Sequence, residues 1–422
     1  MALRVYESTK ELVEEHRRWR DQCWNLIASE NVTSPAVAAL LSNDLSHRYG
    51  DYEGTDLNSR KYLGNRYIVQ IEKTCHDSAR ALFGAEHVDL RPLSGHIAGI
   101  APLLAQCKPG DTVLELNQEC GGHRLAGKTV NCPLIKLRTL PIAFDEDRFN
   151  IDVARTLDTV EREKPRFVIL GSSTFLFPHP VAELRRGIDA LGASTFLQYD
   201  ASHVLGLIAG KRFQRPLAEG ADLITSSTHK TLGGPQGGLV LTNSSTLAEA
   251  VGRALQPGLL SNHHLHRLPA LCETFQEWSE RGSSDADQIV AAAHALAAAL
   301  ERLGVPIVAS HLGYTASHTI LIQAKPFGPA KDLALYLEEA DIILGACRLP
   351  GKLGPDGLRL GTQEVVRRGM RTEDLEEVAG TIAALLKREI DPQSAKKRVN
   401  ILARKTVERS HSDFNDGSNS HE

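Results

Sequence analysis

QYDASHVLGLIAG at residues 198–210 and TSSTHKTLGGPQGGLVL at residues 225–241 are the stretches that decide the fold. Each contains a predicted strand, and the strand ends deliver first Asp200 and His203 and then Lys230. In parallel sheets, ligands bind outside the carboxyl ends of the strands. A carboxylate, a histidine and a lysine at successive strand ends therefore predict a pyridoxal phosphate site. The lysine would form a Schiff base with the cofactor, and the carboxylate would keep its pyridine nitrogen protonated.

A surface lysine before a turn is the alternative explanation of Lys230, and it is the commoner case for one lysine taken alone. The pair Asp200 and His203 upstream makes that alternative much weaker. The glycines that follow Lys230 would also let backbone approach a bound cofactor closely.

The chain around these stretches alternates short β-branched runs with helical patterns, such as the helix expected over 181–191. This alternation predicts an α/β fold whose large domain has a mainly parallel sheet, followed by a smaller C-terminal α+β domain. We expect an N-terminal helical arm over 1–27, the large cofactor-binding domain over 28–280 and the small domain over 281–400. The last segment, 401–422, has almost no core-forming residues, so we expect a mobile polar tail.

Composition excludes several classes of protein. The 422 residues contain 48 Lys and Arg against 52 Asp and Glu, so the net charge of −4 gives no reason to expect a nucleic acid partner. The seven cysteines form no CxxC pair, which disfavours both a disulfide framework and a zinc site. No apolar run approaches the roughly 20 residues of a membrane span. The N-terminus also lacks a signal-peptide pattern, and we expect a cytoplasmic protein.

Further motifs resemble the serine hydroxymethyltransferase family in the family's order, across about residues 20–390. They are LIASENVTSPAV at 26–37, RPLSGHIAG at 91–99, KPGDTVLELNQECGGH at 108–123 and GLRLGT at 357–362, together with the two stretches quoted first. The resemblance implies the fold-type I, aspartate aminotransferase-like architecture and pyridoxal 5'-phosphate as cofactor. It also implies an amino-acid substrate and a homodimer or dimer of dimers with active sites at the interface.

The resemblance also implies roles for individual residues. Lys230 matches the Schiff-base lysine, Asp200 the partner of the ring nitrogen and His203 the neighbour of the phenolic oxygen. His229 precedes the lysine as in the family. The other implied cofactor contacts are Ser94, Gly95, His96, Cys120, Thr174 and Ser227.

Substrate contacts are implied in the same way. Arg359 matches the arginine that holds the substrate carboxylate, a role suited to a planar bidentate donor. Ser29, Tyr49, Tyr62 and His123 are the other implied contacts, and the two tyrosines lie in a loop that reaches the neighbouring subunit in the family. Glu53 is our choice for the carboxylate that handles protons in this loop, with Asp51 as the alternative; either could be a solvated loop charge.

Several positions depart from the family pattern. Cys120 stands where the family has the histidine that stacks on the cofactor ring, and Cys347 stands where we would expect an asparagine that recognises folate.

The glycine-rich loop that contacts the neighbour's phosphate in the family corresponds to QPGLLSNHHLHRLP at 256–269 in this chain. Its histidines, His263, His264 and His266, could suggest a metal site. Three loop histidines without a carboxylate nearby in sequence are more often surface or substrate contacts, so we expect no metal.

Gly122–Thr129, GHRLAGKT, matches the spacing of a phosphate-binding loop. Such a loop needs a helix directly after it, whereas Val130 to Ile135 predicts a strand, so we regard the match as coincidence.

Loss of the folate contacts leads us to expect a folate-independent enzyme of specialised metabolism. The overall departures resemble the pyridoxal phosphate enzymes of lincosamide antibiotic biosynthesis. These process cysteine S-conjugates by β-elimination or by decarboxylation-coupled oxidative deamination. The alternatives are serine hydroxymethyl transfer with tetrahydrofolate, a threonine aldolase or transaldolase, and a non-catalytic binding protein.

Overall fold

The computed structural model describes residues 8–128 and 136–418, with side chains described up to residue 409. The chain forms two compact units. One contains Ser29–Asp287 and Arg348–Gly354; the other contains the chain up to Ala28, Gln288–Cys347 and the chain from Pro355 onward. Val130 to Ile135, where a strand was predicted, lie outside the described residues.

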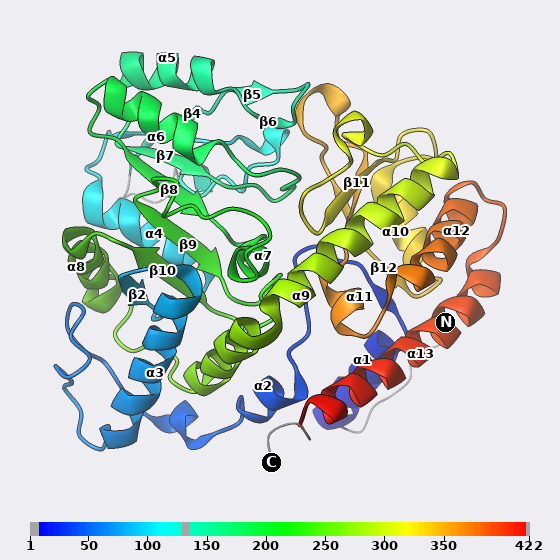
Figure 1. Ribbon diagram of the computed structural model, residues 1–422, viewed down its shortest axis with the longest axis horizontal. Helices are drawn as coiled ribbons and strands as arrows, with labels where there is room; N and C mark the ends of the chain where they lie inside the picture. Colours follow the sequence, from blue (N-terminus) through cyan, green and yellow to red (C-terminus); the bar gives the residue numbers. More distant parts are fainter. Residues whose placement is uncertain (1–7, 129–135, 419–422) are drawn as a thin grey trace. The chain divides into compact units, whose positions relative to one another are not determined.

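The first unit is built on a seven-stranded sheet in the order β2-β10-β9-β8-β7-β3-β4 (Figure 1). The five strands from β9 to β4 run parallel, whereas β10 is antiparallel to both of its neighbours. This confirms the predicted α/β class with a mainly parallel sheet. The strand bounds are β2 His87–Asp89, β3 Thr112–Glu115, β4 Arg138–Pro141, β7 Phe167–Leu170, β8 Phe196–Asp200, β9 Leu223–Ser227 and β10 Gly238–Thr242. A separate hairpin pairs β5 Phe144–Asp145 with β6 Asn150–Ile151.

The central strands are apolar because both faces of the sheet are covered. Every residue of β7, FVIL, is buried, as is every residue of β10. Helix α4, Gly95–Gln106, packs against β9 and β10. The other helices of this unit are α2 Pro35–Ala39, α3 Arg66–Phe83, α5 Val153–Glu163, α6 Val181–Ala190, α7 Leu205–Ala209 and α8 Ser245–Arg253. Helix α9, Arg267–Arg302, begins in this unit and continues into the other.

The second unit has an antiparallel three-stranded sheet in the order β11-β14-β13, formed by Thr319–Gln323, Gly357–Gly361 and Gly345–Cys347. A parallel pair joins β1, Trp24–Asn25, to β12, Ile342–Ile343. The helices are α1 Thr9–Asp21, α10 Ala330–Glu338, α11 Gln363–Arg367, α12 Leu375–Leu386 and α13 Pro392–Ser418. Its core includes Leu300, Leu358, Ile382 and Val399. Antiparallel strands with helices are the α+β pattern predicted for the C-terminal part.

The N-terminal segment differs from the predicted arm. The helix expected to reach Ile27 ends at Asp21, and a strand follows. Trp19 donates from Nε1 to Asp341 Oδ1 at 3.0 Å, within the unit that also holds the C-terminal helices.

The prediction of a mobile tail over 401–422 is wrong as far as Ser418, because α13 extends to that residue. Val399, Leu402, Ala403 and Thr406 are buried at helical spacing. Low apolar content suggested disorder, but one apolar stripe is enough to hold a helix against a core.

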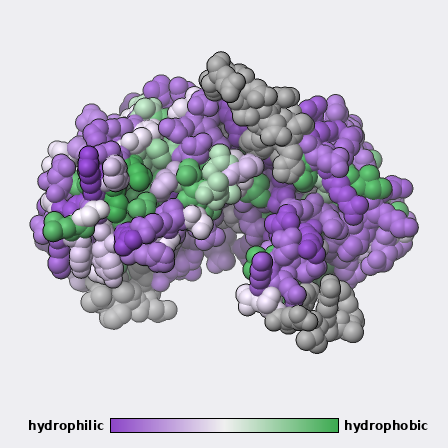
Figure 2. All heavy atoms as spheres, turned by 90° about the horizontal axis from the view of Figure 1, so that it is seen from below, coloured by the Kyte–Doolittle hydropathy of each residue, from purple (hydrophilic) through white to green (hydrophobic). Residues whose placement is uncertain are grey.

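The surface is largely hydrophilic on the face that Figure 2 shows, with hydrophobic residues in smaller areas. Among the described residues, no helix combines the length and the apolar character that crossing a bilayer requires.

Candidate functional site

A cavity of about 180 Å³ lies at the carboxyl ends of the parallel strands in the first unit. Strand β8 brings Asp200 to it, and the turn after β9 brings Lys230. The predicted residues that line this cavity are Ser94, Gly95, His96, His123, Asp200, His203, Ser227, His229 and Lys230. The structure therefore brings together side chains that lie up to about 140 residues apart in sequence.

The turn that carries Lys230 is fixed by backbone hydrogen bonds. Gly234 N–H donates to Thr228 O at 3.0 Å, and Thr228 N–H donates to Gly237 O at 3.1 Å. Gly233 has φ +67°, a conformation that favours glycine. Asn31, which sequence reasoning did not single out, donates from Nδ2 to Lys230 O at 2.9 Å. These hydrogen bonds hold the turn that carries Lys230 in one conformation.

Asp200 is the last residue of β8 and is half-buried. Its Oδ1 accepts a hydrogen bond from Ser202 N–H at 2.9 Å. Ser202 Oγ in turn accepts from Ser227 N–H at 3.0 Å, which ties the end of β8 to the end of β9. The acidic side chain is therefore held beside the strand end that leads to the lysine.

The N-terminus of α4 forms another wall of the cavity. Ser94 caps this twelve-residue helix by accepting from Ile97 N–H at 3.2 Å. A Cβ on Gly95 would lie 2.8 Å from Ser227 N, so only glycine allows this close approach. Unpaired N–H groups and the helix dipole at such a position suit a phosphate.

Histidines supply much of the remaining wall. Burial lowers the pKa of His96, His123 and His229, and nearby lysines add to the effect for each of them. These imidazoles are therefore neutral at pH 7 and available to accept a proton or a hydrogen bond. The buried Nδ1 atoms of His96 and His229 have no hydrogen-bond partner in the protein, so each can form a hydrogen bond with a bound polar group.

Two of the implied cofactor contacts lie elsewhere. Cys120 and Thr174 line a smaller neighbouring cavity together with Phe175 and Phe144. The Cys120 side chain accepts a hydrogen bond from Gly351 N–H, and burial raises its pKa. Ser172 and Ser173, which follow β7 after Gly171, line the main cavity in place of Thr174. Sequence reasoning missed them because three consecutive hydroxyl residues follow the strand, and pattern alone cannot rank them.

The loop of residues 48–65 presents its predicted residues differently. Tyr49 and Tyr62 are exposed and pack ring to ring with centroids 5.1 Å apart. Glu53 is exposed, whereas Asp51 is half-buried. The roles assigned to these residues remain predictions.

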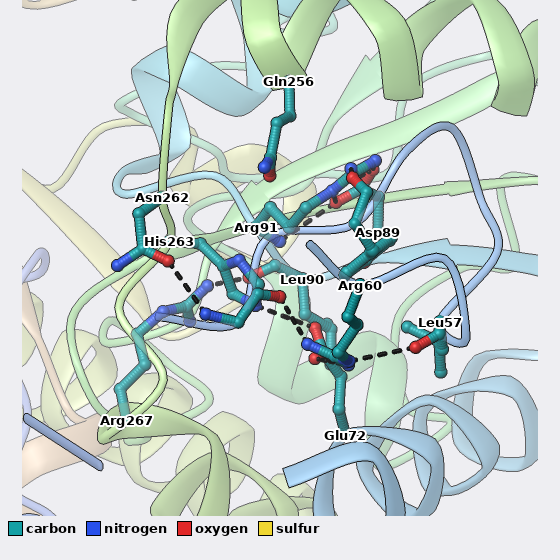
Figure 3. Close-up of polar contacts among 12 residues, drawn as sticks. Leu57, Arg60, Glu72, Asp89, Leu90, Arg91, Gln256, Asn262, His263 and Arg267 are labelled. Atoms are coloured by element: carbon teal, nitrogen blue, oxygen red, sulfur yellow. Dashed lines mark hydrogen bonds and ion pairs between the residues drawn. The ribbon is translucent and has the colours of Figure 1, made fainter. Parts of the chain in front are cut away.

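The histidine loop differs from its prediction in one respect. His263 is buried, and its Nε2 lies 3.0 Å from Glu72 Oε1 (Figure 3). Spacing gave no sign of this carboxylate because Glu72 lies far away in sequence. Among the described residues, no group of three or more metal-type ligands gathers there or elsewhere.

Ser29 is half-buried in the first unit. Arg359 and Cys347 belong to the second unit, on β14 and β13. Burial lowers the pKa of Arg359, and Cys347 lies near enough to oppose that shift. The carboxylate-binding role of Arg359 remains a prediction.

Comparison with known proteins decides the family. Residues 4–382 match the family model described as serine hydroxymethyltransferase. The chain belongs to the serine hydroxymethyltransferase family. A serine hydroxymethyltransferase of Methanopyrus kandleri is 41% identical over 416 residues, covering 97% of this chain and 95% of that protein. The enzyme of Korarchaeum cryptofilum is 40% identical over 418 residues, covering 95% of each.

A solved structure carries the same fold. The L-threonine transaldolase from Pseudomonas fluorescens, determined in its internal aldimine state, aligns with a TM-score of 0.88 at 29% identity. The alignment covers 94% of this chain and 90% of that one. The chain is therefore a fold-type I pyridoxal phosphate enzyme, of the transferase type that this family represents.

The described site fits pyridoxal 5'-phosphate. Lys230 and Asp200 line one cavity, the N-terminus of α4 supplies a cradle for a phosphate, and two buried imidazole nitrogens lack partners. Lys230 would hold the cofactor's aldehyde carbon, Asp200 its ring nitrogen, and Ser94 and Gly95 its phosphate.

Proposed function

We propose that this enzyme acts without folate and breaks a bond at Cβ of an amino-acid substrate, releasing the sulfur of a cysteine S-conjugate. The observation that carries the proposal is Cys120. At this position the family resemblance calls for a histidine, but here a cysteine faces a second cavity lined by Phe144, Phe149 and Phe175. A thiol cannot stack on the cofactor ring as a flat imidazole would, so this side of the site departs from the one that serves serine in the family.

The chain's own residues account for the steps. The bound cofactor supplies a ring that accepts electrons from the substrate Cα. Asp200 holds a proton at the ring nitrogen, and Arg359 binds the substrate carboxylate. Lys230 Nζ takes the proton from Cα, and the electron pair of the broken Cβ–S bond leaves with sulfur. Decarboxylation-coupled oxidative deamination of the same substrate class begins with the same binding residues and additionally consumes oxygen.

A second candidate is cleavage or exchange at the Cα–Cβ bond, as in an aldolase or transaldolase. The structural likeness to the L-threonine transaldolase favours it. Hydroxymethyl transfer with tetrahydrofolate is favoured by the curated relatives. It requires pterin recognition to be rebuilt without the asparagine that Cys347 replaces.

A substrate screen separates these candidates. Holoenzyme is incubated with S-benzyl-L-cysteine, with L-threonine plus benzaldehyde, and with L-serine plus tetrahydrofolate. Released thiol, keto acid, acetaldehyde and glycine are followed in each. We expect thiol and keto acid from the first mixture. Fast glycine formation only with tetrahydrofolate would overturn the proposal, and acetaldehyde release from the second would favour the transaldolase.

A homodimer with active sites at the interface and a cytoplasmic location remain predictions from the sequence. We include the homodimer in the proposal because the family builds its active sites from two subunits.

A further inference from the structure

Two cysteine side chains meet between helices α3 and α9 in the first unit (Figure 1). Cys75 lies on α3 and is completely buried, whereas Cys272 lies on α9 and is half-buried. Their thiols form a hydrogen bond with each other. The two helices also touch where the rings of Phe83 and Phe275 meet edge to face, with centroids 5.9 Å apart. The two sulfur atoms are therefore neighbours in a packed part of the fold, although they lie far apart in sequence.

Buried cysteines often serve only as small apolar side chains of a core. This explanation suits Cys23 and Cys107, because burial raises the pKa of each thiol to about 12. It does not account for Cys272. A hydrogen bond from Cys75, together with one from Ser78, lowers the pKa of the Cys272 thiol to about 7, although burial and a neighbouring carboxylate oppose this shift. Among the six cysteines that the structure describes, Cys272 alone has a lowered pKa.

The two thiols differ in the way that stepwise oxidation of a thiol pair requires. Cys272 is partly ionised near pH 7 and is half-buried rather than enclosed, so a small oxidant can reach a reactive thiolate. Burial raises the pKa of Cys75 well above its ordinary value, so this thiol stays protonated and donates its S–H to Cys272. An accessible cysteine of low pKa beside a second cysteine is the arrangement of redox-sensitive pairs, in which the second thiol attacks the oxidised first.

A buried arginine lies close to this thiol pair. The side chain of Arg267 is 3% exposed, and its positive charge interacts with Cys75. Its Nη2 donates to the carbonyls of Leu90, Pro92 and Gly238. Its Nε and Nη1 have no hydrogen-bond partner within the described part of the chain. A cation beside a thiol favours the thiolate, so Arg267 helps Cys75 to lose its proton when it reacts.

We infer that Cys272 and Cys75 form a redox-sensitive modification site, at which a peroxide converts the two thiols into a disulfide that links α9 to α3. Neither thiol lines the main cavity, so this site is independent of the proposed function.

The oxidation proceeds in two steps. The Cys272 thiolate attacks one oxygen of hydrogen peroxide, and the O–O bond breaks. Cys272 becomes a sulfenic acid, and the other oxygen leaves as water with the proton that the thiol released on ionisation. Cys75 then attacks the oxidised sulfur, the S–O bond breaks, and the oxygen leaves as a second water with the proton of Cys75. The two cysteines lose two electrons in total, and one peroxide molecule is reduced to two molecules of water.

Alkylation rates measure the reactivity of Cys272 directly. In reduced holoenzyme at pH 7, Cys272 should react with iodoacetamide roughly 100-fold faster than Cys107, because far more of its thiol is ionised. Both side chains are half-buried, so Cys107 is the matched comparison. Equal rates for the two cysteines would show that Cys272 is not activated and would overturn the inference.

The disulfide should also make the protein harder to unfold. It joins two distant points of the chain, which lowers the entropy of the unfolded state. We expect the thermal midpoint of peroxide-treated wild-type holoenzyme to rise by about 5 °C or more, and to return to its original value with dithiothreitol. The same treatment of Cys272→Ser should leave its midpoint unchanged. An equal rise in that variant would contradict a link between these two cysteines.

Mass spectrometry of the holoenzyme tests the disulfide itself. Reduced holoenzyme is treated with hydrogen peroxide, the remaining thiols are blocked with N-ethylmaleimide in denaturant, and the protein is digested without reductant. We expect the Cys75 and Cys272 peptides to be joined by a disulfide and to separate after dithiothreitol. Two free thiols after this treatment, or Cys272 joined to a different cysteine, would overturn the inference.

Variants separate the roles of the two thiols. In Cys75→Ser, Cys272 should still be oxidised but should stop at the sulfenic acid, which dimedone traps. In Cys272→Ser, Cys75 should stay reduced, because its thiol is buried and protonated. Cys107→Ser is the control and should form the disulfide as the wild type does. Oxidation of Cys75 in Cys272→Ser at the wild-type rate would contradict the assigned roles.

Discussion

Asp200 has the most specific chemical task of the residues in the cavity. It ends β8, and Ser202 N–H fixes its Oδ1. Asp200→Asn keeps the shape but cannot balance a positive charge at the cofactor's ring nitrogen. We expect turnover to fall by roughly 100-fold or more, with a much smaller change in cofactor affinity.

Steady-state rates and cofactor titration of Asp200→Asn measure the two effects separately. Asp158→Asn, an exposed acid on α5, is the matched control. A turnover rate of Asp200→Asn equal to that of the wild type would show that Asp200 takes no part in the reaction.

Individual residues also show how far the sequence alone could be followed. Asp200, His203 and Lys230 were predictable because a strand end places a side chain at a known edge of a sheet. The position of Thr174 was not predictable, because three consecutive hydroxyl residues follow β7 and only the backbone decides which of them faces the cavity. Glu72 was not predictable as a partner of His263, because nothing local to either residue indicates that pairing.

At the scale of elements, the N-terminus of α4 has a role that a single substitution can test. Gly95→Ala places a methyl group 2.8 Å from the backbone nitrogen of Ser227. The helix must shift, and overpacking of this kind costs about 1–3 kcal/mol. We expect cofactor affinity to fall by roughly tenfold or more, measured by fluorescence titration of the apoenzyme.

Gly380→Ala is the control for that experiment, because a Cβ there would meet nothing within 4 Å. It should leave cofactor affinity unchanged. Equal affinities for Gly95→Ala and the wild type would mean that the α4 N-terminus does not hold the phosphate.

Helix α3 contributes Glu72 to buried ion pairs with Arg60 and His263, and the ionisation of Glu72 links folding to pH. Burial alone would raise the pKa of Glu72, but the hydrogen bond and charge of His263, with His76 and Arg60, lower it to about 2. A depressed folded-state pKa stabilises the protein above the unfolded-state pKa of about 4.3, and this stabilisation is lost as pH falls toward 2.

Glu72→Gln should therefore lower the thermal midpoint at pH 7, and the gap to the wild type should narrow at pH 3.5. Breaking a buried pair costs on the order of 3 kcal/mol at neutral pH. Glu376→Gln, from an exposed pair with Arg302, should change little at either pH. A gap for Glu72→Gln that stays constant with pH would contradict this ionisation.

Elements were predictable where their pattern was strong. Helix α6, expected over 181–191, begins at Val181 and ends at Ala190. The C-terminal helix was not predicted because few of its residues are apolar. Its buried residues Val399, Leu402 and Thr406 nevertheless share one face of the helix.

For the whole molecule, the family resemblance implies that two subunits share each site. Subunits carrying Lys230→Ala, and subunits that lack both candidate loop carboxylates through Asp51→Asn and Glu53→Gln, should each have little activity alone. If the loop serves the neighbouring subunit, each mixed dimer contains one intact site of two, and the purified mixed dimer should recover about half of wild-type activity. Coexpression with two different tags, followed by activity measurement on the purified mixed dimer, checks this. Activity no higher than that of the single variants would mean that the loop serves its own subunit.

The account rests on Lys230 as the residue that bonds pyridoxal phosphate. Borohydride reduction of the holoenzyme, proteolysis and mass spectrometry of the peptides measure this bond directly. The account predicts a reduced pyridoxal phosphate adduct on the peptide containing Lys230, and none in Lys230→Ala. An adduct on another lysine, or no adduct in holoenzyme that retains the cofactor, would contradict it.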